Sequence, residues 1–334
     1  MLPLPLPLVR VLDLTASVAG ASASRMLADY GAEVIVVERP GQPRGTMVQY
    51  GRNKYSCVID PASEAGRDLV LRLAARCNVV LKDGADDALA AQDYGAFREA
   101  RDDIVLAVIA DGGERPGIGI VTAGAVMTAL FYVRFRGQGQ QVTVTFAAAG
   151  ASMRTAPIVA ASAGASQLTP DLPPSGCYAC ADGSIAVVAR SIEELAALGD
   201  AVGRPELADA MTGGVGLGDA VAAWTAGRAA HAAATELREH GIPAQALLTP
   251  SALRDDPHLR ARGVFEPIAA GSGVGETDGP RVRFGATPLH TRFPAPTPGE
   301  HTGYVLRDLI GLSEDEIASL AAVGIVSGAI AGAE

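Results

Sequence analysis

The chain has 334 residues, of which 49% are hydrophobic and 19% charged, a balance that excludes a disordered chain and predicts a globular protein. Its formal net charge of −10 at pH 7 argues against general affinity for nucleic acid. The length allows either two domains or one large one.

The N-terminal stretch MLPLPLPL is apolar, but it lacks the basic segment of a signal peptide and its prolines oppose a helix. The uncharged run over residues 117–133 is short for a membrane span and contains three glycines. We therefore expect a buried helix there, and a soluble cytoplasmic protein.

Residues 8–40 predict a strand, a helix and a second strand. The apolar run over 8–14 is typical of a strand covered on both faces, and residues 19–30 have helical spacing. A second apolar strand over 34–37 then predicts a right-handed βαβ unit and a parallel sheet. The segment Glu38-Arg39-Pro40-Gly41 follows this strand, at the carboxyl edge where open α/β sheets bind ligands.

A basic segment over residues 39–54 comes next and contains no acidic residue. Its cationic residues are Arg39, Arg44, Arg52 and Lys54. A local charge of this kind in an acidic protein favours a phosphate-binding loop, and a solvated basic loop is the alternative.

The rest of the first half continues the alternation of strands and helices. Asp60 is predicted to cap a helix that begins at Pro61. Further strands are predicted over 78–81, 104–109 and 141–146, and helices over 118–135 and 147–163. These elements predict a doubly wound α/β domain.

A Pro-rich stretch over 169–175 is the expected linker to a smaller α+β domain. A Pro-rich strap begins near Val282, and a final helix begins with a capping box at Ser313. We therefore expect a large domain built from residues 1–170 and 285–334, and a small domain over 176–284.

The four cysteines predict neither a metal site nor a redox site. Cys177 and Cys180 form a CxxC inside a predicted hairpin that turns at Asp182-Gly183. A zinc ribbon needs a second pair, which Cys57 and Cys77 do not supply. We expect buried thiols and no bound metal.

Several segments together resemble the family III CoA-transferases, the group of formyl-CoA transferase, carnitine CoA-transferase and α-methylacyl-CoA racemase. The similar segments, in the family's order, are RVLDLT, MLADYGAEVIVVERP, GRNKYSCVID, RGQGQQVTV, HGIPAQALLTP, TPLHTRFPAPTPGEHTGYVL and GLSEDEIASL. The resemblance covers most of the chain.

This resemblance implies a Rossmann-like domain built from both chain ends, a smaller domain and an interlocked homodimer. It also implies an acyl-CoA or acyl-carrier thioester as substrate, with no permanently bound cofactor. The matching CoA-binding positions are Arg39, Arg52 and Lys54, with Lys82 in a third loop where the family's Asn-Phe-x-Pro-Gly pattern is absent.

The catalytic segment departs from the family. Transferases of the family use an Asp that attacks the acyl-CoA, and the racemase branch uses an Asp and a His. Ile120 occupies the position of that Asp, and the preceding segment is shortened after Arg115-Pro116-Gly117. Asp111 and Glu114 are weak candidates for a replacement, the alternative being a solvent-exposed polar turn.

Two functions therefore remain open. One is an enzyme that acts on an acyl thioester by CoA transfer or α-carbon racemisation with an unusual carboxylate. The other is a protein that keeps the fold without the chemistry and binds a CoA or acyl thioester, or an active partner. We expect no nucleic acid or membrane as partner, and we do not expect the usual anhydride mechanism.

Overall fold

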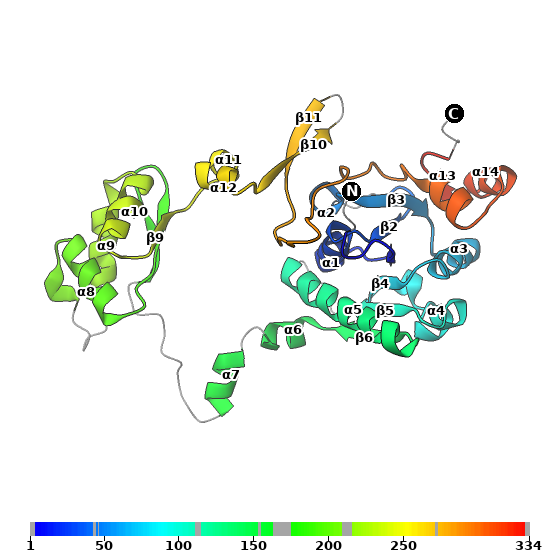
Figure 1. Ribbon diagram of the computed structural model, residues 1–334, viewed down its shortest axis with the longest axis horizontal. Helices are drawn as coiled ribbons and strands as arrows, with labels where there is room; N and C mark the ends of the chain where they lie inside the picture. Colours follow the sequence, from blue (N-terminus) through cyan, green and yellow to red (C-terminus); the bar gives the residue numbers. More distant parts are fainter. Residues whose placement is uncertain are drawn as a thin grey trace. The chain divides into compact units, whose positions relative to one another are not determined.

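The chain forms two compact units, which we describe separately (Figure 1). The computed structural model describes residues 4–42, 45, 47–110, 115–152, 155–162, 175–208, 216–270 and 273–330. The first unit is Met1–Met153 with Gly263–Glu334, and the second is Arg154–Arg262. The large unit thus begins its second segment at Gly263, whereas the sequence placed residues 263–284 in the small domain.

A seven-stranded sheet organises the large unit. Its strands are β1 (Arg10–Asp13), β2 (Glu33–Glu38), β3 (Lys54–Ile59), β4 (Val79–Asp83), β5 (Val105–Ile109), β6 (Gln140–Val144) and β12 (Val326–Ser327). The order is β12-β3-β2-β1-β4-β5-β6, and β12 alone of these is antiparallel to its neighbour. The predicted parallel sheet and βαβ unit are confirmed. The strand β2 lies on one side of β1 and β4 lies on the other, so the order of strands reverses between β1 and β4. This reversal is a topological switch point.

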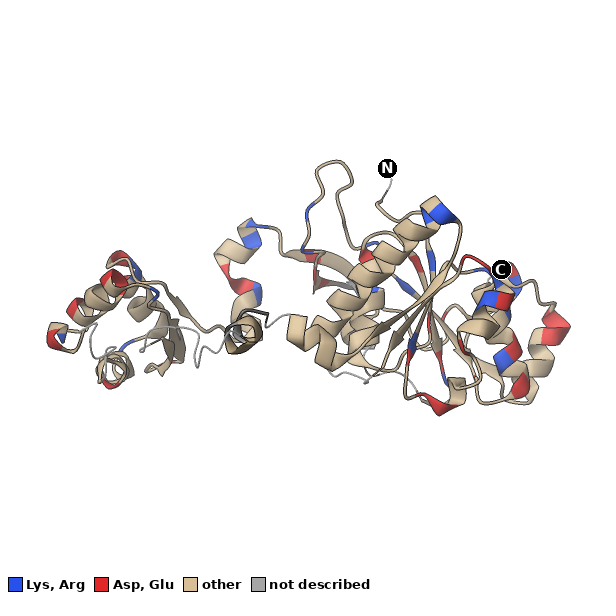
Figure 2. Ribbon diagram, turned by 90° about the horizontal axis from the view of Figure 1, so that it is seen from below, with Lys and Arg blue, Asp and Glu red and all other residues tan. Residues whose placement is uncertain are grey.

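Two core clusters cover the two faces of this sheet because neighbouring strand residues point in opposite directions. Val11 packs with apolar residues of α1 (Val18–Asp29) and α5 (Pro116–Arg136). Leu12 packs on the other face, with residues of α3 (Glu64–Ala74), α4 (Tyr94–Ala100) and α14 (Glu314–Ala322). The charged residues of the strands lie at or next to strand ends, and most of them are buried (Figure 2).

Shorter elements complete the large unit. They are α2 (Met47–Tyr50), η1 (Asp87–Leu89), α6 (Phe146–Ser152), the hairpin β10 (Phe265–Ala270) and β11 (Gly273–Asp278), and α13 (Thr302–Tyr304), which continues into a π-helical turn (Val305–Leu309). The predicted capping box at Ser313 is present at the start of α14.

Helix α5 is long and apolar enough to cross a membrane by length and composition, the one such helix in the part of the chain that the structure describes. In this unit it packs along α1, where Gly119 lies close to the backbone of Ala19. Its opposite face exposes Ile120, Phe131 and Phe135. The expectation of a buried helix is therefore right for one face and wrong for the other.

The second unit is α+β, as predicted. A three-stranded antiparallel sheet, in the order β7-β8-β9, packs against short helices around a core of its own. Its elements are α7 (Thr155–Ser162), β7 (Gly176–Ala179), β8 (Ser184–Val187), α8 (Ile192–Ala201), η2 (Pro205–Leu207), α9 (Leu217–Ala226), α10 (Ala230–Glu239), β9 (Ala244–Ala246), α11 (Pro250–Asp255) and α12 (Pro257–Ala261).

Some local predictions were wrong. Ser63, not Asp60, caps α3, because its Oγ accepts the Gly66 N–H at 3.0 Å. The helix predicted over 147–163 is two helices, α6 and α7. The cysteine hairpin is confirmed, but Cys177 is exposed and Cys180 only partly buried, because most of β7 is exposed to solvent.

Candidate functional site

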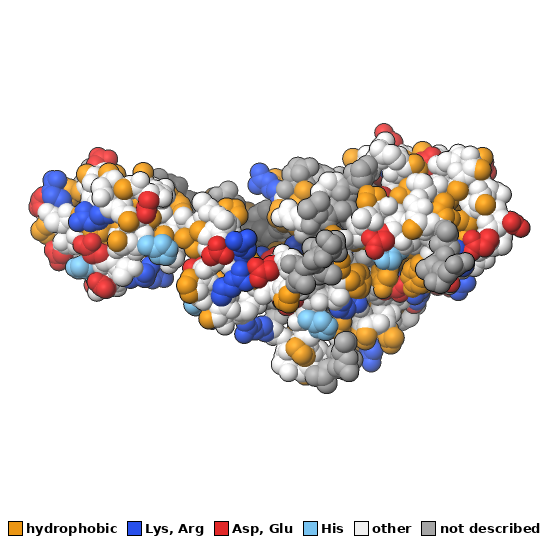
Figure 3. All heavy atoms as spheres, turned by 90° about the horizontal axis from the view of Figure 1, so that it is seen from above, with side chains coloured by type: hydrophobic (Ala, Val, Ile, Leu, Met, Phe, Trp, Pro, Cys, Tyr) orange, Lys and Arg blue, Asp and Glu red, His pale blue; other side chains and the backbone are white. Residues whose placement is uncertain are grey.

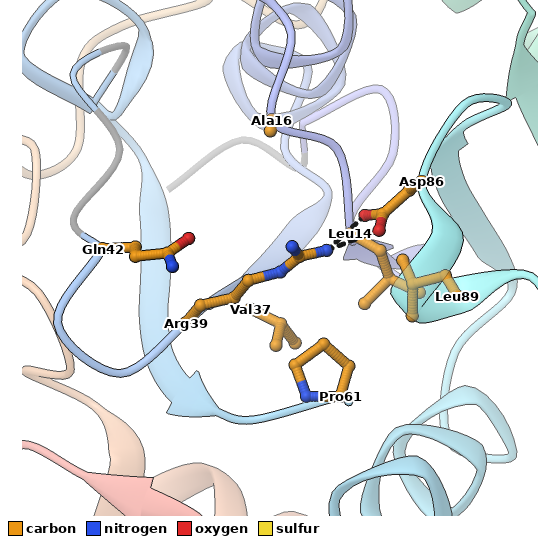
Figure 4. A pocket seen from close by; sticks show the side chains of 8 residues that line it. All are labelled: Leu14, Ala16, Val37, Arg39, Gln42, Pro61, Asp86 and Leu89. Carbon is orange, nitrogen blue, oxygen red and sulfur yellow. Dashed lines mark hydrogen bonds and ion pairs between the residues drawn. The ribbon is translucent and has the colours of Figure 1, made fainter. Parts of the chain in front are cut away.

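A cavity of about 90 Å³ lies at the carboxyl edge of the large sheet. Its wall comes from β2 and from the segments that follow β1, β2, β3 and β4. The lining residues are Leu14, Ala16, Val37, Arg39, Gln42, Pro61, Asp86 and Leu89 (Figure 4). The cavity therefore lies beside the switch point between β1 and β4, where open parallel sheets bind ligands.

Arg39 provides the guanidinium of this cavity. A tight turn holds it directly after β2: the Gln42 N–H donates to the Arg39 carbonyl at 3.0 Å, and Gly41 adopts φ +68°. Pro40 and Gly41 are the residues that a type II turn favours at its two central positions. The Arg39 side chain is 38% exposed, so solvent and solutes reach its guanidinium.

An acidic side chain already pairs with this guanidinium. Nη2 of Arg39 lies 2.6 and 2.5 Å from the two carboxylate oxygens of Asp86 (Figure 4). Around this pair the wall is mostly apolar, formed by Leu14, Val37 and Leu89 among others.

Asp83 fixes the loop between β1 and α1 at the same edge. Its carboxylate accepts from the backbone N–H groups of Ala16 at 2.7 Å and Ser17 at 3.0 Å, and from the Ser17 hydroxyl at 2.7 Å. Ser17 in turn caps α1 by accepting the Gly20 N–H at 3.1 Å. The wall at Ala16 is thus rigidly held.

Lys82 does not line the cavity. This residue is part of β4, not of a loop, and it is buried. Its ammonium donates to the carbonyls of Leu89 at 2.7 Å and Gln92 at 3.1 Å. Burial lowers the pKa of Lys82, and the nearby Asp86 and Asp93 oppose that shift. Lys82 therefore anchors the segment that carries Asp86.

Arg52 lies far from the predicted phosphate site. It precedes β3 and is buried, with Nε and Nη2 on the Asp29 carboxylate at 2.9 and 2.7 Å. Its Nη1 donates to Asp278 of β11 at 3.0 Å. Arg52 thus belongs to a structural ion-pair network at the amino edge of the sheet.

Lys54 is also engaged inside the protein. It is the first residue of β3 and is 1% exposed. Its ammonium donates to the Ser24 hydroxyl at 2.7 Å and the Ala21 carbonyl at 3.0 Å, and lies 3.8 Å from Asp13. The predicted cluster of Arg39, Arg52 and Lys54 does not form, because β3 begins at the edge opposite to the one where β2 ends. Arg44 lies outside the described residues.

Ile120, which the resemblance aligns with the catalytic Asp of the family, is among the described residues. Ile120 lies in the first turns of α5 and is 57% exposed. The sequence of α5 contains no Asp or Glu. The two replacement candidates, Asp111 and Glu114, lie outside the described residues.

Three of the carboxylates described at the carboxyl edge, Glu38, Asp83 and Asp86, have other partners. Glu38 is 1% exposed and accepts from the Ser56 hydroxyl, which itself accepts the Gly299 N–H at 2.7 Å. Asp83 is held by the loop before α1 and Asp86 by Arg39.

Sequence reasoning missed Asp86 and Gln42 as cavity residues. Asp86 follows the end of β4, so its position at the carboxyl edge was a usable signal. The approach of Asp86 to Arg39 could not be predicted, because the two residues are 47 positions apart in the sequence.

Comparison with known proteins places these observations in a family. The sequence profile of CoA-transferase family III matches residues 6–110 and 116–302. The chain is 29% identical over 407 aligned positions to a succinyl-CoA–D-citramalate CoA-transferase from Chloroflexus aurantiacus, covering 97% of this chain and 98% of that one. It is 24% identical to a succinyl-CoA:mesaconate CoA-transferase from Haloarcula hispanica, covering 87% and 91%.

Solved structures share the fold. A CaiB/BaiF family protein from Brucella suis superposes with a TM-score of 0.76 at 20% identity, covering 92% of this chain and 99% of that one. Rv3272 from M. tuberculosis superposes with a TM-score of 0.75 at 21% identity, covering 91% and 100%.

Proposed function

This chain belongs to CoA-transferase family III, and from that premise we propose that it binds a coenzyme A thioester at the cavity beside β1 and β4 and transfers CoA between carboxylic acids. The observation that carries the proposal is Arg39, a solvent-accessible guanidinium at the switch point of the sheet. Arg suits the phosphates of CoA because its planar donors meet two oxygens at once. The relatives above are named transferases, which favours transfer over α-carbon racemisation.

Binding at this site is tested by calorimetric titration with CoA. Loss of a hydrogen bond to a charged group costs about 1.5–3 kcal/mol, so Arg39→Ala should weaken CoA binding by roughly tenfold or more. Arg98→Ala is the matched control, because Arg98 is exposed on α4. Equal affinity in the wild type and Arg39→Ala contradicts the proposed site.

We place the chemical step at a carboxylate outside α5, so that anhydride chemistry, which we do not expect at the usual position, starts from another residue. In CoA transfer, a carboxylate oxygen attacks the thioester carbonyl carbon, the C–S bond breaks, and CoA leaves as the thiolate while a mixed anhydride remains. Because α5 contains no Asp or Glu, it supplies no carboxylate for this attack at or near the position of Ile120. The profile match is interrupted at residues 111–115, and the alignment with the citramalate transferase runs over 407 positions although the chain has 334 residues. The break in the profile match supports a difference from the family just before α5, and the alignment length indicates that the relative has residues that this chain lacks.

Trapping the intermediate tests this step. The protein is incubated with succinyl-CoA and hydroxylamine, digested, and searched by mass spectrometry for a hydroxamate on Asp or Glu. The proposal predicts a modified peptide that contains Asp111 or Glu114. Variants Asp111→Asn and Glu114→Gln should then abolish the modification at the residue concerned.

A second candidate function is CoA-thioester binding without chemistry, and the acid-free sequence of α5 favours it. A protein of this kind binds CoA through Arg39 but yields no hydroxamate. The titration and the trapping experiment therefore separate the two candidates.

We also propose that the chain assembles as a homodimer. Ile120, Phe131, Tyr132 and Phe135 of α5 are between 43% and 66% exposed, and Phe146 of α6 is 41% exposed. Residues 120 and 131 are eleven positions apart, about three helical turns, so they share one face of α5. Exposed apolar faces of this kind mark protein interaction sites. On the face drawn in Figure 3, charged side chains of both signs are interspersed over each unit.

A further inference from the structure

We propose that Asp86 determines the ligand specificity of the carboxyl-edge cavity by competing with ligand phosphate for Arg39. The inference rests on the proposed function, since it assumes that the cavity receives a CoA-type nucleotide. It concerns a residue to which the resemblance assigns no role.

The geometry makes Asp86 a direct competitor. Both of its carboxylate oxygens lie within 2.6 Å of Nη2 of Arg39. A phosphate that binds Arg39 through this nitrogen has to occupy the same place (Figure 4). The carboxylate also repels an approaching phosphate, because both carry negative charge.

Asp86 is held in this position by its own segment. Its Oδ1 accepts the Ala88 N–H at 3.1 Å and so caps η1. Lys82 anchors the same segment through the Leu89 and Gln92 carbonyls. The Asp86 side chain is 12% exposed and that of Arg39 is 38% exposed. Arg39 is therefore the freer partner, and the expected exchange is movement of its guanidinium from the fixed carboxylate to the ligand.

This arrangement has a consequence for ligand choice. A ligand without phosphate at this point leaves the Arg39–Asp86 pair intact and gains nothing when Asp86 loses its charge. A ligand whose phosphate binds Nη2 of Arg39 has to break the pair. Asp86 thus weakens binding of phosphate-bearing ligands relative to phosphate-free ones that share the same pantetheine arm.

The test compares Asp86→Asn with the wild type by calorimetric titration. Asn retains the capping ability of Asp and removes its charge, so the fold is preserved. Asp86→Ser, which also caps but has a shorter side chain, is the second variant. Asp87→Asn is the matched control, because Asp87 is the neighbouring acid and is exposed. The probes are CoA, dephospho-CoA and pantetheine, with thermal denaturation to verify folding.

We expect Asp86→Asn and Asp86→Ser to bind CoA about two- to fivefold more tightly, which corresponds to the energy of a partly exposed ion pair. Pantetheine affinity should be unchanged. A gain for CoA but not for dephospho-CoA assigns the 3′-phosphate to Arg39, and a gain for both assigns the diphosphate. Asp87→Asn should bind CoA as the wild type does.

The inference is overturned if the Asp86 variants bind CoA no better than the wild type, or if they bind it more weakly, which would make Asp86 a ligand-binding residue. An equal gain in Asp87→Asn also overturns it, because the effect is then one of net charge. If either result occurs while the wild type binds CoA and Arg39→Ala weakens that binding, only the role of Asp86 is contradicted and the proposed function is unaffected. If neither the wild type nor any variant binds CoA, both the role of Asp86 and the proposed function are contradicted.

Discussion

Arg52 stabilises the large unit by joining the end of α1 to the hairpin β10–β11. Its guanidinium contacts Asp29 at 2.7 Å and Asp278 at 3.0 Å and is almost fully buried. Removing one partner of a buried ion pair costs about 3–5 kcal/mol when the other charge is left alone. Here Arg25 remains beside both carboxylates, 3.9 Å from Asp29 and 2.7 Å from Asp278. Arg52→Ala should therefore lower the free energy of unfolding by less, about 1.5–3 kcal/mol, the energy of hydrogen bonds to a charged group, measured by urea denaturation.

The control for this prediction is Arg98→Ala, for which we expect a change within about 0.5 kcal/mol, as for other exposed residues. Comparable stability of the two variants would show that the ion pairs of Arg52 contribute little. We also expect Arg52→Ala, once its folding is verified, to bind CoA with the affinity of the wild type.

His301 makes the stability of the large unit depend on pH. Its Nδ1 accepts the Ser56 N–H at 3.3 Å, and its ring packs on Tyr55 with centroids 4.9 Å apart. Burial lowers the pKa of His301 below its ordinary value of 6.5, and Glu300 opposes the shift. Between the pKa of His301 in the folded protein and 6.5, the unfolded chain binds more protons at this residue than the folded chain does. The free energy of unfolding therefore rises with pH across that window, and the full penalty of burying the charged ring applies below it.

In His301→Asn, this part of the pH dependence should disappear. Asn retains an acceptor near the Ser56 N–H but does not titrate. Denaturation curves at several pH values below neutrality test the prediction: the wild type should lose more stability on acidification than the variant. Parallel losses in both proteins would contradict it.

At the residue scale, the sequence predicted Arg39 at the sheet edge but placed Arg52 and Lys54 at the same site wrongly. The segment over 39–54 contains no acid, so its cations looked unpaired. Their partners, Asp29, Asp278 and Asp13, are supplied by α1, β11 and β1. Such long-range pairing cannot be deduced from local composition.

At the element scale, close packing of α1 and α5 depends on Gly119. A Cβ at this position would lie 2.5 Å from the Ala19 carbonyl oxygen and 2.7 Å from Ser22 Cβ. Gly119→Ala should therefore destabilise the protein by about 1–3 kcal/mol, since the helices must move apart. Thermal or urea denaturation measures the change.

The same helix supplies a matched control. A Cβ at Gly124 would meet nothing within 4 Å. Because Ala is the better helix former, Gly124→Ala should stabilise by up to about 1 kcal/mol. If both variants change stability in the same direction, the packing explanation for Gly119 is wrong.

The predicted strands match β1, β2, β4, β5 and β6 closely, and most of these are short apolar runs between turn residues, whereas β3 was not predicted. The hairpin β10–β11 was missed because its sequence, FEPIAAGSGVGETD, has little β-branched or aromatic content. The edge strand β12 has two residues, too few for any periodicity.

At the scale of the whole molecule, the exposed face of α5 predicts a dimer. Phe131 and Phe135 contact each other edge to face, with centroids 4.6 Å apart, and are 65% and 66% exposed. Charges on this face would be buried without partners in a dimer, which is costly. The double variant Phe131→Asp/Phe135→Asp should therefore be monomeric by light scattering after size exclusion.

Val323→Asp is the control, because Val323 is 70% exposed at the end of α14, far in sequence from α5. The wild type and this control should both have the mass of two chains. A monomeric wild type, or a double variant that stays dimeric, would rule out α5 as the interface.

A crystal structure of the protein with CoA tests the central claim most directly, that the cavity beside β1 and β4 receives the nucleotide. We predict a CoA phosphate within hydrogen-bonding distance of the Arg39 guanidinium, with the Arg39–Asp86 pair broken. CoA bound elsewhere on the chain, with Arg39 still on Asp86, would contradict the account.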